Sequence, residues 1–197
     1  MRFKRLILTC AVFAVGLVFA GLPWAAAAQK VMPPIVGENG MPTQAWFKKS
    51  GNDLARDLTE AVNNKKLLAI VWEQRGCYYC KQMHELNFQV EDVVSYVRDR
   101  FEFVQLDLRG NRVLMDLQGN PATETMLARQ SRVTGTPTIQ FLDRHGKEVF
   151  RMPGYAKPAL FLTVFEYVAE AAYKSKSLKE YVVAKNSAAE NGFKQTR

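Results

Sequence analysis

A continuous apolar run from Leu67 to Trp72 leads, through a four-residue turn, into two closely spaced cysteines, Cys77 and Cys80. A run of this length without polar alternation is typical of a central strand that is covered on both faces. After Cys80, apolar residues recur at helical spacing, with a break expected near Asn87. They are Met83, Leu86, Val90, Val93, Val94 and Val97. The cysteines are therefore predicted at the turn from a buried strand into a helix.

The spacing of the cysteines favours a reactive pair over a structural crosslink. Cys10 lies in the apolar stretch at the N-terminus, so Cys77 and Cys80 are the pair expected in the processed protein. A disulfide that closes so short a loop restricts the unfolded chain only a little. At a helix N-terminus, unpaired N–H groups and the helix dipole favour thiolate over thiol. We therefore assign Cys77 as the attacking thiol, and Cys80 as the less exposed thiol that resolves the mixed disulfide.

The remaining pattern predicts one α/β domain. Helices are expected at 53–62, 122–130 and 157–173, and strands at 101–108, 138–142 and 148–152. Strands that are joined by helices pair in parallel, and the final hairpin adds antiparallel strands to the same sheet. The predicted architecture is a mixed central sheet with flanking helices.

The N-terminus has the order of a secretory signal peptide. Basic residues, an apolar stretch and an alanine cluster that ends at Ala28 follow one another. We expect residues 1–28 to be removed, although an uncleaved N-terminal anchor is the alternative. No second apolar stretch is long enough to cross a bilayer. We predict a linker at 29–44, the domain at 45–173 and a basic C-terminal tail at 174–197, in a periplasmic protein.

The net charge of +8 reflects the ends of the chain. The signal peptide and the lysine-rich tail carry most of it, and the domain between them is nearly neutral. A solvated tail explains this distribution better than a nucleic-acid surface does. We therefore expect no nucleic-acid partner.

A second motif, Gly135-Thr136-Pro137-Thr138, lies immediately before an expected strand. Proline is tolerated at a strand start because it has no N–H to donate to the ladder. Tight X-Pro turns are also where cis peptide bonds occur. Alone the motif is weak, since a trans proline at a strand start is the default. Together with a C-x-x-C pair at a strand-to-helix turn, it becomes specific.

From about Asp53 to Ala172 the chain resembles the thioredoxin superfamily. SoxW-type periplasmic thioredoxins, which are associated with sulfur-oxidation clusters, are similar to it at Trp72–His84, at the strand that ends in Asp107, at Gly135–Thr138 and at Gly154-Tyr155. The resemblance implies a thioredoxin-like fold. It also implies that Pro137 is cis and packs beside the cysteines, and that the backbone of Thr136 pairs with the substrate peptide.

The chain departs from cytoplasmic thioredoxin at two places. Tyr78-Tyr79 stands where thioredoxin has Gly-Pro, and Val71 stands where thioredoxin has a buried aspartate that accepts a proton. Glu73 and Glu85 are candidate replacements for this proton acceptor. A carboxylate near a buried thiol can serve this role at neutral pH only if its environment raises its pKa. A solvated surface carboxylate is the simpler identity for each.

Aromatic residues gather around the expected site. Tyr78 and Tyr79 are expected to be exposed and to contact the partner chain, as aromatic side chains do at recognition surfaces. Trp72 is assigned to the core. Tyr155 belongs to the same aromatic group.

We interpret the chain as an enzyme, a thioredoxin-like reductase of disulfides in exported proteins. No nucleotide or phosphate loop is visible, so no cofactor is expected and electrons must come from another protein. The resemblance suggests a membrane thiol carrier as donor, and sulfur-carrier or cytochrome c maturation proteins as acceptors. One alternative is a disulfide oxidase or isomerase, which the absence of a dimerisation domain and of a cation between the cysteines disfavours.

A metal-binding module is a further alternative. Cys77, Cys80 and His84 would supply three ligands to zinc or copper, whereas a structural zinc site takes four. His84, one turn after Cys80, is more simply a residue on the helix surface. We therefore assign no metal site.

Overall fold

The computed structural model describes the backbone of residues 31–195 and the side chains of residues 31–188. The expected signal peptide lies outside the described residues. Within them, no helix is both long and apolar enough to cross a membrane.

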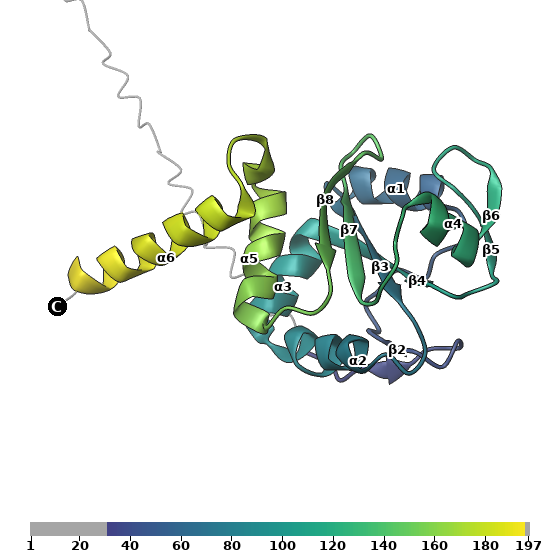
Figure 1. Cartoon of the computed structure of the whole chain (residues 1–197), viewed down its shortest axis with the longest axis horizontal. Coiled ribbons are helices and arrows are strands. Elements are labelled where there is room, and N and C mark those ends of the chain that lie inside the picture. Colours follow the sequence, from purple (N-terminus) through teal and green to yellow (C-terminus); the bar gives the residue numbers. More distant parts are fainter. Residues whose placement is uncertain (1–30, 196–197) are drawn as a thin grey trace, which may run out of the picture.

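A four-stranded mixed sheet forms the centre of the molecule (Figure 1). Its strands are β3 (Leu67–Glu73), β4 (Phe101–Asp107), β7 (Thr138–Leu142) and β8 (Glu148–Pro153), in the order β4-β3-β7-β8. β3 and β4 are parallel, and β7 pairs antiparallel with both β3 and β8. The predicted mixed sheet is confirmed, and β3 lies at its centre as its apolar run indicates.

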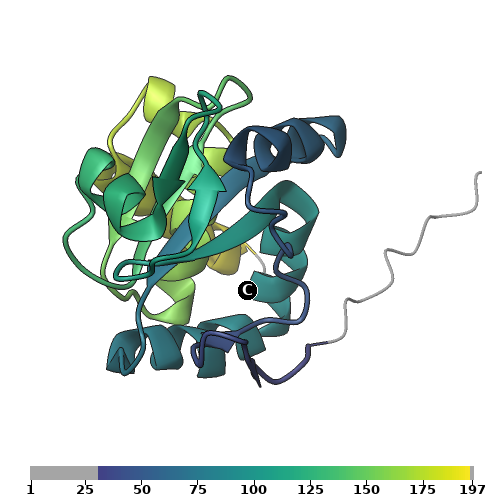
Figure 2. The same cartoon turned by 90° about the vertical axis from the view of Figure 1, so that its right-hand side faces the viewer.

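Helices cover both faces of the sheet (Figure 1, Figure 2). They are α1 (Leu54–Asn63), α2 (Tyr78–Glu85), the 3-10 helix η1 (Asn87–Gln89), α3 (Glu91–Arg100), α4 (Glu124–Gln130) and α5 (Pro158–Ala169). α1 and α4 pack on one face, and α2, α3 and α5 pack on the other. Asp53 caps α1 by accepting a hydrogen bond from the N–H of Arg56 at 2.9 Å. The break expected near Asn87 is the 3-10 helix between α2 and α3.

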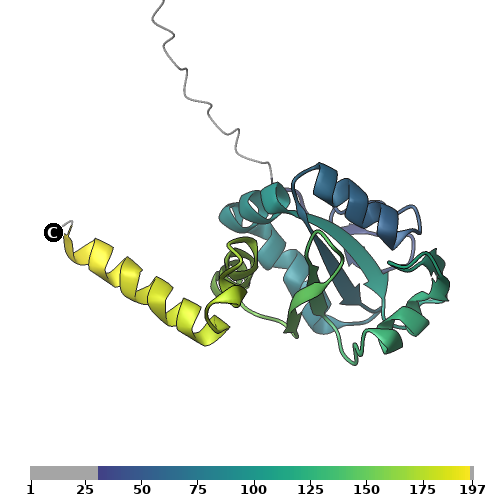
Figure 3. The same cartoon turned by 90° about the horizontal axis from the view of Figure 1, so that it is seen from above.

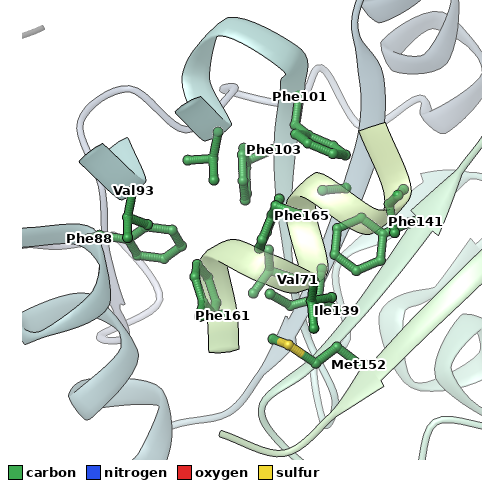
Figure 4. Packing of buried hydrophobic residues seen from close by; sticks show 14 of the residues in the cluster. Val71, Phe88, Val93, Phe101, Phe103, Ile139, Phe141, Met152, Phe161 and Phe165 are labelled. Atoms are coloured by element: carbon green, nitrogen blue, oxygen red, sulfur yellow. The ribbon is translucent and has the colours of Figure 1, made fainter. Parts of the chain in front are cut away.

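Alternate residues of β3 pack into two separate hydrophobic cores. Ala69 and Val71 face α2, α3 and α5, whereas Leu68, Ile70 and Trp72 face α1 and α4. The first core is rich in aromatic rings, several of which surround Phe165 (Figure 4). The rings of Phe101, Phe141 and Phe161 have centroids 4.8–4.9 Å from that of Phe165. The second core is mostly aliphatic, and Trp72 is buried in it as expected.

Two small hairpins were not predicted from the sequence. β1 (Ile35–Val36) pairs with β2 (Pro42–Thr43), and β5 (Val113–Met115) pairs with β6 (Pro121–Thr123). Strands of two or three residues are too short to show an alternating pattern, and Pro42 and Pro121 further argue against a strand. The first hairpin lies within the segment predicted as a linker, and Met41 beside it is fully buried.

The C-terminal segment, expected as a tail, is helical. After η2 (Ala172–Lys174), α6 (Leu178–Gln195) extends outward from the domain (Figure 1, Figure 3). Leu178 and Tyr181 pack against the aromatic core. The hydroxyl of Tyr181 donates to Glu170, the C-cap of α5, at 2.8 Å. The start of α6 is therefore docked on α5.

Candidate active site

The cysteine pair lies where β3 turns into α2. Gly76 adopts a φ of +73°, a left-handed conformation that glycine accepts without strain. Cys77 is the N-cap of α2, and its Sγ accepts a hydrogen bond from the N–H of Cys80 at 3.1 Å. The two cysteines form a disulfide with their Cα atoms 5.3 Å apart. Cys77 is half-buried and Cys80 is fully buried, an arrangement that suits an attacking and a resolving thiol, respectively.

The start of β7 and the end of β8 complete the mouth of the site. Thr138 pairs with Trp72 near the end of β3, so Pro137 lies at the same end of the sheet as the cysteines. The Thr136–Pro137 peptide is cis, as the resemblance implies. The N–H of Gly154 donates to the carbonyl of Pro137 at 2.7 Å. Within the described part of the chain, no backbone hydrogen bond involves Thr136, so its polar groups are free to pair with a peptide.

Three tyrosines form an aromatic rim around the cysteines. Tyr78 and Tyr79 are 65% and 56% exposed, as expected for residues that meet a partner. Their rings meet edge to face at 5.3 Å, and Tyr79 stacks on Tyr155 with centroids 5.9 Å apart. Burial, with a smaller contribution from Tyr78, raises the pKa of Tyr155, so this ring stays uncharged at neutral pH. The rim therefore joins α2 to the loop after β8 through apolar contact.

Glu73 and His84 are buried, contrary to the expectation that both lie at the surface. Each side chain has a relative exposure of 0%. His84 Nε2 lies 3.0 and 3.1 Å from the two carboxylate oxygens of Glu73. Glu73 continues the alternation of β3 onto the side of Val71, and His84 shares the buried side of α2 with Cys80. The expectation was wrong because Glu73 was placed in the turn, although strand period and the i, i+4 helix spacing both indicate burial.

Two glutamines that the sequence did not single out complete this buried cluster. The Nε2 of Gln105 donates to Glu73 and to the carbonyl of Pro42. The Nε2 of Gln44 lies 3.2 Å from both Nδ1 and the carbonyl oxygen of His84. The rings of Phe47 and Phe88 flank the imidazole, with centroids 5.6 and 5.5 Å away. Both rings belong to the aromatic core, so apolar side chains pack against the polar cluster.

The structure does not gather the three metal ligands considered from the sequence. Both ring nitrogens of His84 face Gln44 and Glu73, and the two cysteines are joined to each other. Among the described residues, no group of three or more His, Cys, Asp or Glu side chains could hold a metal ion. Glu85, the other carboxylate considered as proton acceptor, is exposed and pairs with Lys81 at 3.7 Å.

Comparisons with solved structures show the same fold in other proteins. A thioredoxin-fold protein from Helicobacter pylori is 24% identical, with a TM-score of 0.56 over 64% of this chain and 87% of that one. A protein from Bacteroides thetaiotaomicron described as a putative disulphide-isomerase is 21% identical, with a TM-score of 0.52 over 68% of this chain and all of that one. No curated protein sequence matches the chain.

A family model matches the region that contains the site. Residues 54–169, from the start of α1 to the end of α5, match the model of the thioredoxin-like domain. This range contains the cysteine pair, the cis proline and the loop that carries Tyr155. The thioredoxin-like fold and the C-x-x-C disulfide together support thiol–disulfide redox chemistry. The chain belongs to the thioredoxin-like domain family.

Proposed function

We propose that the protein is an exported, periplasmic thiol–disulfide reductase of the SoxW type. The observation that carries the proposal is the contrast between the two sulfurs at the start of α2. Cys77 is half-buried at the helix N-terminus, where N–H groups favour its thiolate, and Cys80 is buried one turn further along. A partner disulfide can therefore reach only one of the two sulfurs first.

The reaction begins with the reduced protein. The thiolate of Cys77 attacks one sulfur of the partner's disulfide, so a bond between Cys77 and the partner forms while the partner's second sulfur leaves as a thiolate. Cys80 then loses its proton to solvent and attacks Sγ of Cys77. The Cys77–Cys80 disulfide forms, and the partner's first sulfur leaves as a thiolate. Two electrons have passed to the partner, whose two sulfurs take up protons from water.

The surroundings of Cys77 favour the reducing direction. A strongly oxidising pair needs its reduced form stabilised as a thiolate, which a neighbouring cation or imidazolium provides. The residues between the cysteines are two neutral tyrosines, and the side chain of Arg75 before them is exposed to solvent. His84 is turned toward Glu73. Among the described residues, no cationic side chain is hydrogen-bonded to Sγ of Cys77, which accepts from the N–H of Cys80 at the helix N-terminus.

The mouth of the site suits an extended peptide. Thr136 offers a free backbone N–H and carbonyl beside Pro137, and Tyr78 and Tyr79 offer exposed rings. Backbone pairing gives affinity for any extended chain, and the rings add contact area. We assign Thr136, Pro137, Tyr78 and Tyr79 to substrate binding. Exported proteins of sulfur oxidation or cytochrome c maturation would be reduced here, and a membrane thiol carrier would restore the dithiol.

Insulin reduction tests the proposal. Protein lacking residues 1–28 should accelerate the precipitation of insulin chains with dithiothreitol as electron donor, since the reduced pair transfers electrons to accessible disulfides. The variant Cys77→Ser should match the rate of dithiothreitol alone. A wild-type protein that leaves insulin intact, yet rapidly oxidises a reduced unfolded protein, would be an oxidase.

A further inference from the structure

The loop that carries the cis proline is held at both ends by residues of β8 and the turn after it. At its start, the guanidinium of Arg151 donates to the carbonyl oxygens of Ser131 and Arg132, at 2.7 and 3.1 Å. At its end, the N–H of Gly154 donates to the carbonyl oxygen of Pro137 at 2.7 Å. We infer that Arg151 is a positioning residue that fixes this loop in the form that pairs with a substrate peptide. The inference rests on the proposed function and names a residue on which the affinity for the substrate depends.

The anchor depends on the planar fork of an arginine side chain. Nε and Nη2 of Arg151 donate to the two carboxylate oxygens of Glu148, at 2.6 and 2.7 Å. Nη2 and Nη1 also supply the two bonds to the loop carbonyls. A two-point pair with a carboxylate fixes the plane of the guanidinium, so its remaining N–H groups have a set direction. The ammonium of a lysine has no such fork and cannot reach all four acceptors at once.

Glu148 is itself held in place from the centre of the sheet. The indole Nε1 of Trp72 can only donate, and it donates to Oε1 of Gln140, so the amide nitrogen of Gln140 faces Glu148 at 2.8 Å. Burial raises the pKa of Glu148, but the hydrogen bonds from Arg151 and Gln140 outweigh this effect and hold the pKa below its ordinary value. Glu148 is therefore charged at neutral pH. Hydrogen bonds run without a gap from β3, the strand that leads to the cysteines, to the start of the loop.

The start of the loop needs an external partner. Ser131 and Arg132 directly follow α4, and carbonyl groups at a helix C-terminus lack partners within the helix and favour a nearby cation. Arg132 also has a φ of +53°, a left-handed conformation that is uncommon outside glycine. Such a conformation persists where the surrounding structure holds it. Arg151 supplies both the partner and the restraint.

The middle of the loop is the part that meets the substrate. Within the described chain, the backbone N–H groups of residues 134–136 have no hydrogen-bond partner, so this segment takes its shape from its two ends. A segment that is ordered before binding loses less conformational entropy when a peptide pairs with it. Loosening the anchor should therefore weaken peptide binding at Thr136 and leave the chemistry of the sulfurs unchanged.

Reduction of fluorescently labelled insulin by wild type, Arg151→Lys and Arg129→Lys tests the inference. Arg151→Lys keeps the positive charge and removes the fork, whereas Arg129→Lys makes the same change at an exposed position in the last turn of α4. With dithiothreitol as electron donor, Arg151→Lys should raise KM about three- to tenfold at unchanged kcat, as expected when a hydrogen bond that orders the loop is lost. Its reduction of hydroxyethyl disulfide and its reduction potential should equal those of wild type. Arg129→Lys should match wild type throughout.

Glu148→Gln is a second variant that acts on the same anchor from its other side. It should raise KM for insulin in the same direction, and the double variant should be little worse than Arg151→Lys alone, because the two residues act as one unit. Additive effects, an unchanged KM in Arg151→Lys, or equal losses on insulin and hydroxyethyl disulfide would each overturn the inference. If the wild-type protein proves to be an oxidase, the same comparison is made with a reduced unfolded protein as substrate. Failure of the proposed direction is thus distinguishable from failure of the anchor.

Hydrogen exchange tests the anchor without any activity. The N–H of Val133 donates to the carbonyl oxygen of Ala128, and the N–H of Gly154 donates to that of Pro137, so the two amides report on the two ends of the loop. Both should exchange at least about threefold faster in Arg151→Lys than in wild type, while the amides of β3 keep their protection. Unchanged exchange at both ends, or equal acceleration in β3, would overturn the inference.

Discussion

The two sides of α2 have opposite characters although they belong to one short helix. The outer side carries Tyr78, Tyr79 and the solvated pair Lys81–Glu85. The inner side carries Cys80 and His84, both fully buried. The outer side is thus available to a partner protein, while the inner side is packed within the domain.

Glu73 and Glu85 differ in the same way, one buried and one exposed, although both are glutamates. Glu85 is exposed and 3.7 Å from Lys81, whereas Glu73 has no exposed surface and contacts His84 and Gln105. Water screens a surface charge, so an exposed pair contributes about 0–1 kcal/mol. A charge in the interior is screened far less. Position in the fold, more than residue type, therefore decides how strongly a carboxylate's charge acts on its surroundings.

The largest effect should come from removing either cysteine, because the half-buried and the buried sulfur act in turn. Cys80→Ser should accumulate mixed disulfides with partner proteins, since Cys77 still attacks and nothing resolves the product. Cys77→Ser should trap none. Non-reducing gels of tagged protein recovered from the exporting compartment would measure both.

The reverse pattern of trapping would contradict the roles assigned to the two sulfurs. If Cys77→Ser trapped partners and Cys80→Ser did not, the buried sulfur would be the attacking one. The double variant is the control, and it should trap nothing in either case.

The aromatic core should respond to truncation far more strongly than the aromatic rim. Phe165→Ala should lower the free energy of unfolding by about 3–5 kcal/mol, because a buried ring leaves a cavity. Tyr78→Ala should change it by less than about 0.5 kcal/mol, since that ring is 65% exposed. Urea denaturation followed by circular dichroism measures both. A comparable loss in the two variants would place Tyr78 in the fold instead of the docking surface.

A smaller effect on activity is expected when a tyrosine of the aromatic rim is truncated. Tyr79→Ala should lower kcat/KM for insulin by about three- to tenfold, because its stacking on Tyr155 and its contact with the partner are lost together. Reduction of the small substrate hydroxyethyl disulfide should change little. Tyr79→Phe keeps the ring and should behave as wild type. Equal losses on both substrates would mean that Tyr79 acts on the cysteines themselves.

The smallest effect on activity should follow truncation after Tyr173. α6 contacts Glu166 in the C-terminal half of α5 and the C-cap residue Glu170, whereas the rim lies before the N-terminus of α5. Twelve helical residues at 1.5 Å each separate the two ends by about 18 Å. Insulin reduction should be unchanged, while the loss of Leu178 and Tyr181 should reduce stability by about 1–2 kcal/mol. A large loss of activity would give α6 a role in partner binding.

Sequence patterns predicted the long elements well because each repeats its period several times. β3, β4 and α3 have the expected positions, and the strand-to-helix turn located the cysteines. The same patterns missed what depends on contacts between distant segments. Gln44 reaches His84 across forty residues, and Gln105 reaches Glu73 from the neighbouring strand. The strand and helix periods indicate the burial of Glu73 and His84, but their glutamine partners lie on distant segments and could not be predicted from local sequence.

The reduction potential of the Cys77–Cys80 couple, measured against glutathione at pH 7, tests the central claim most directly. With no cation in the dipeptide between the cysteines, the potential should lie near that of thioredoxin, about −270 mV. A value close to that of the strongly oxidising catalysts, about −120 mV, would contradict the account and make the protein an oxidase.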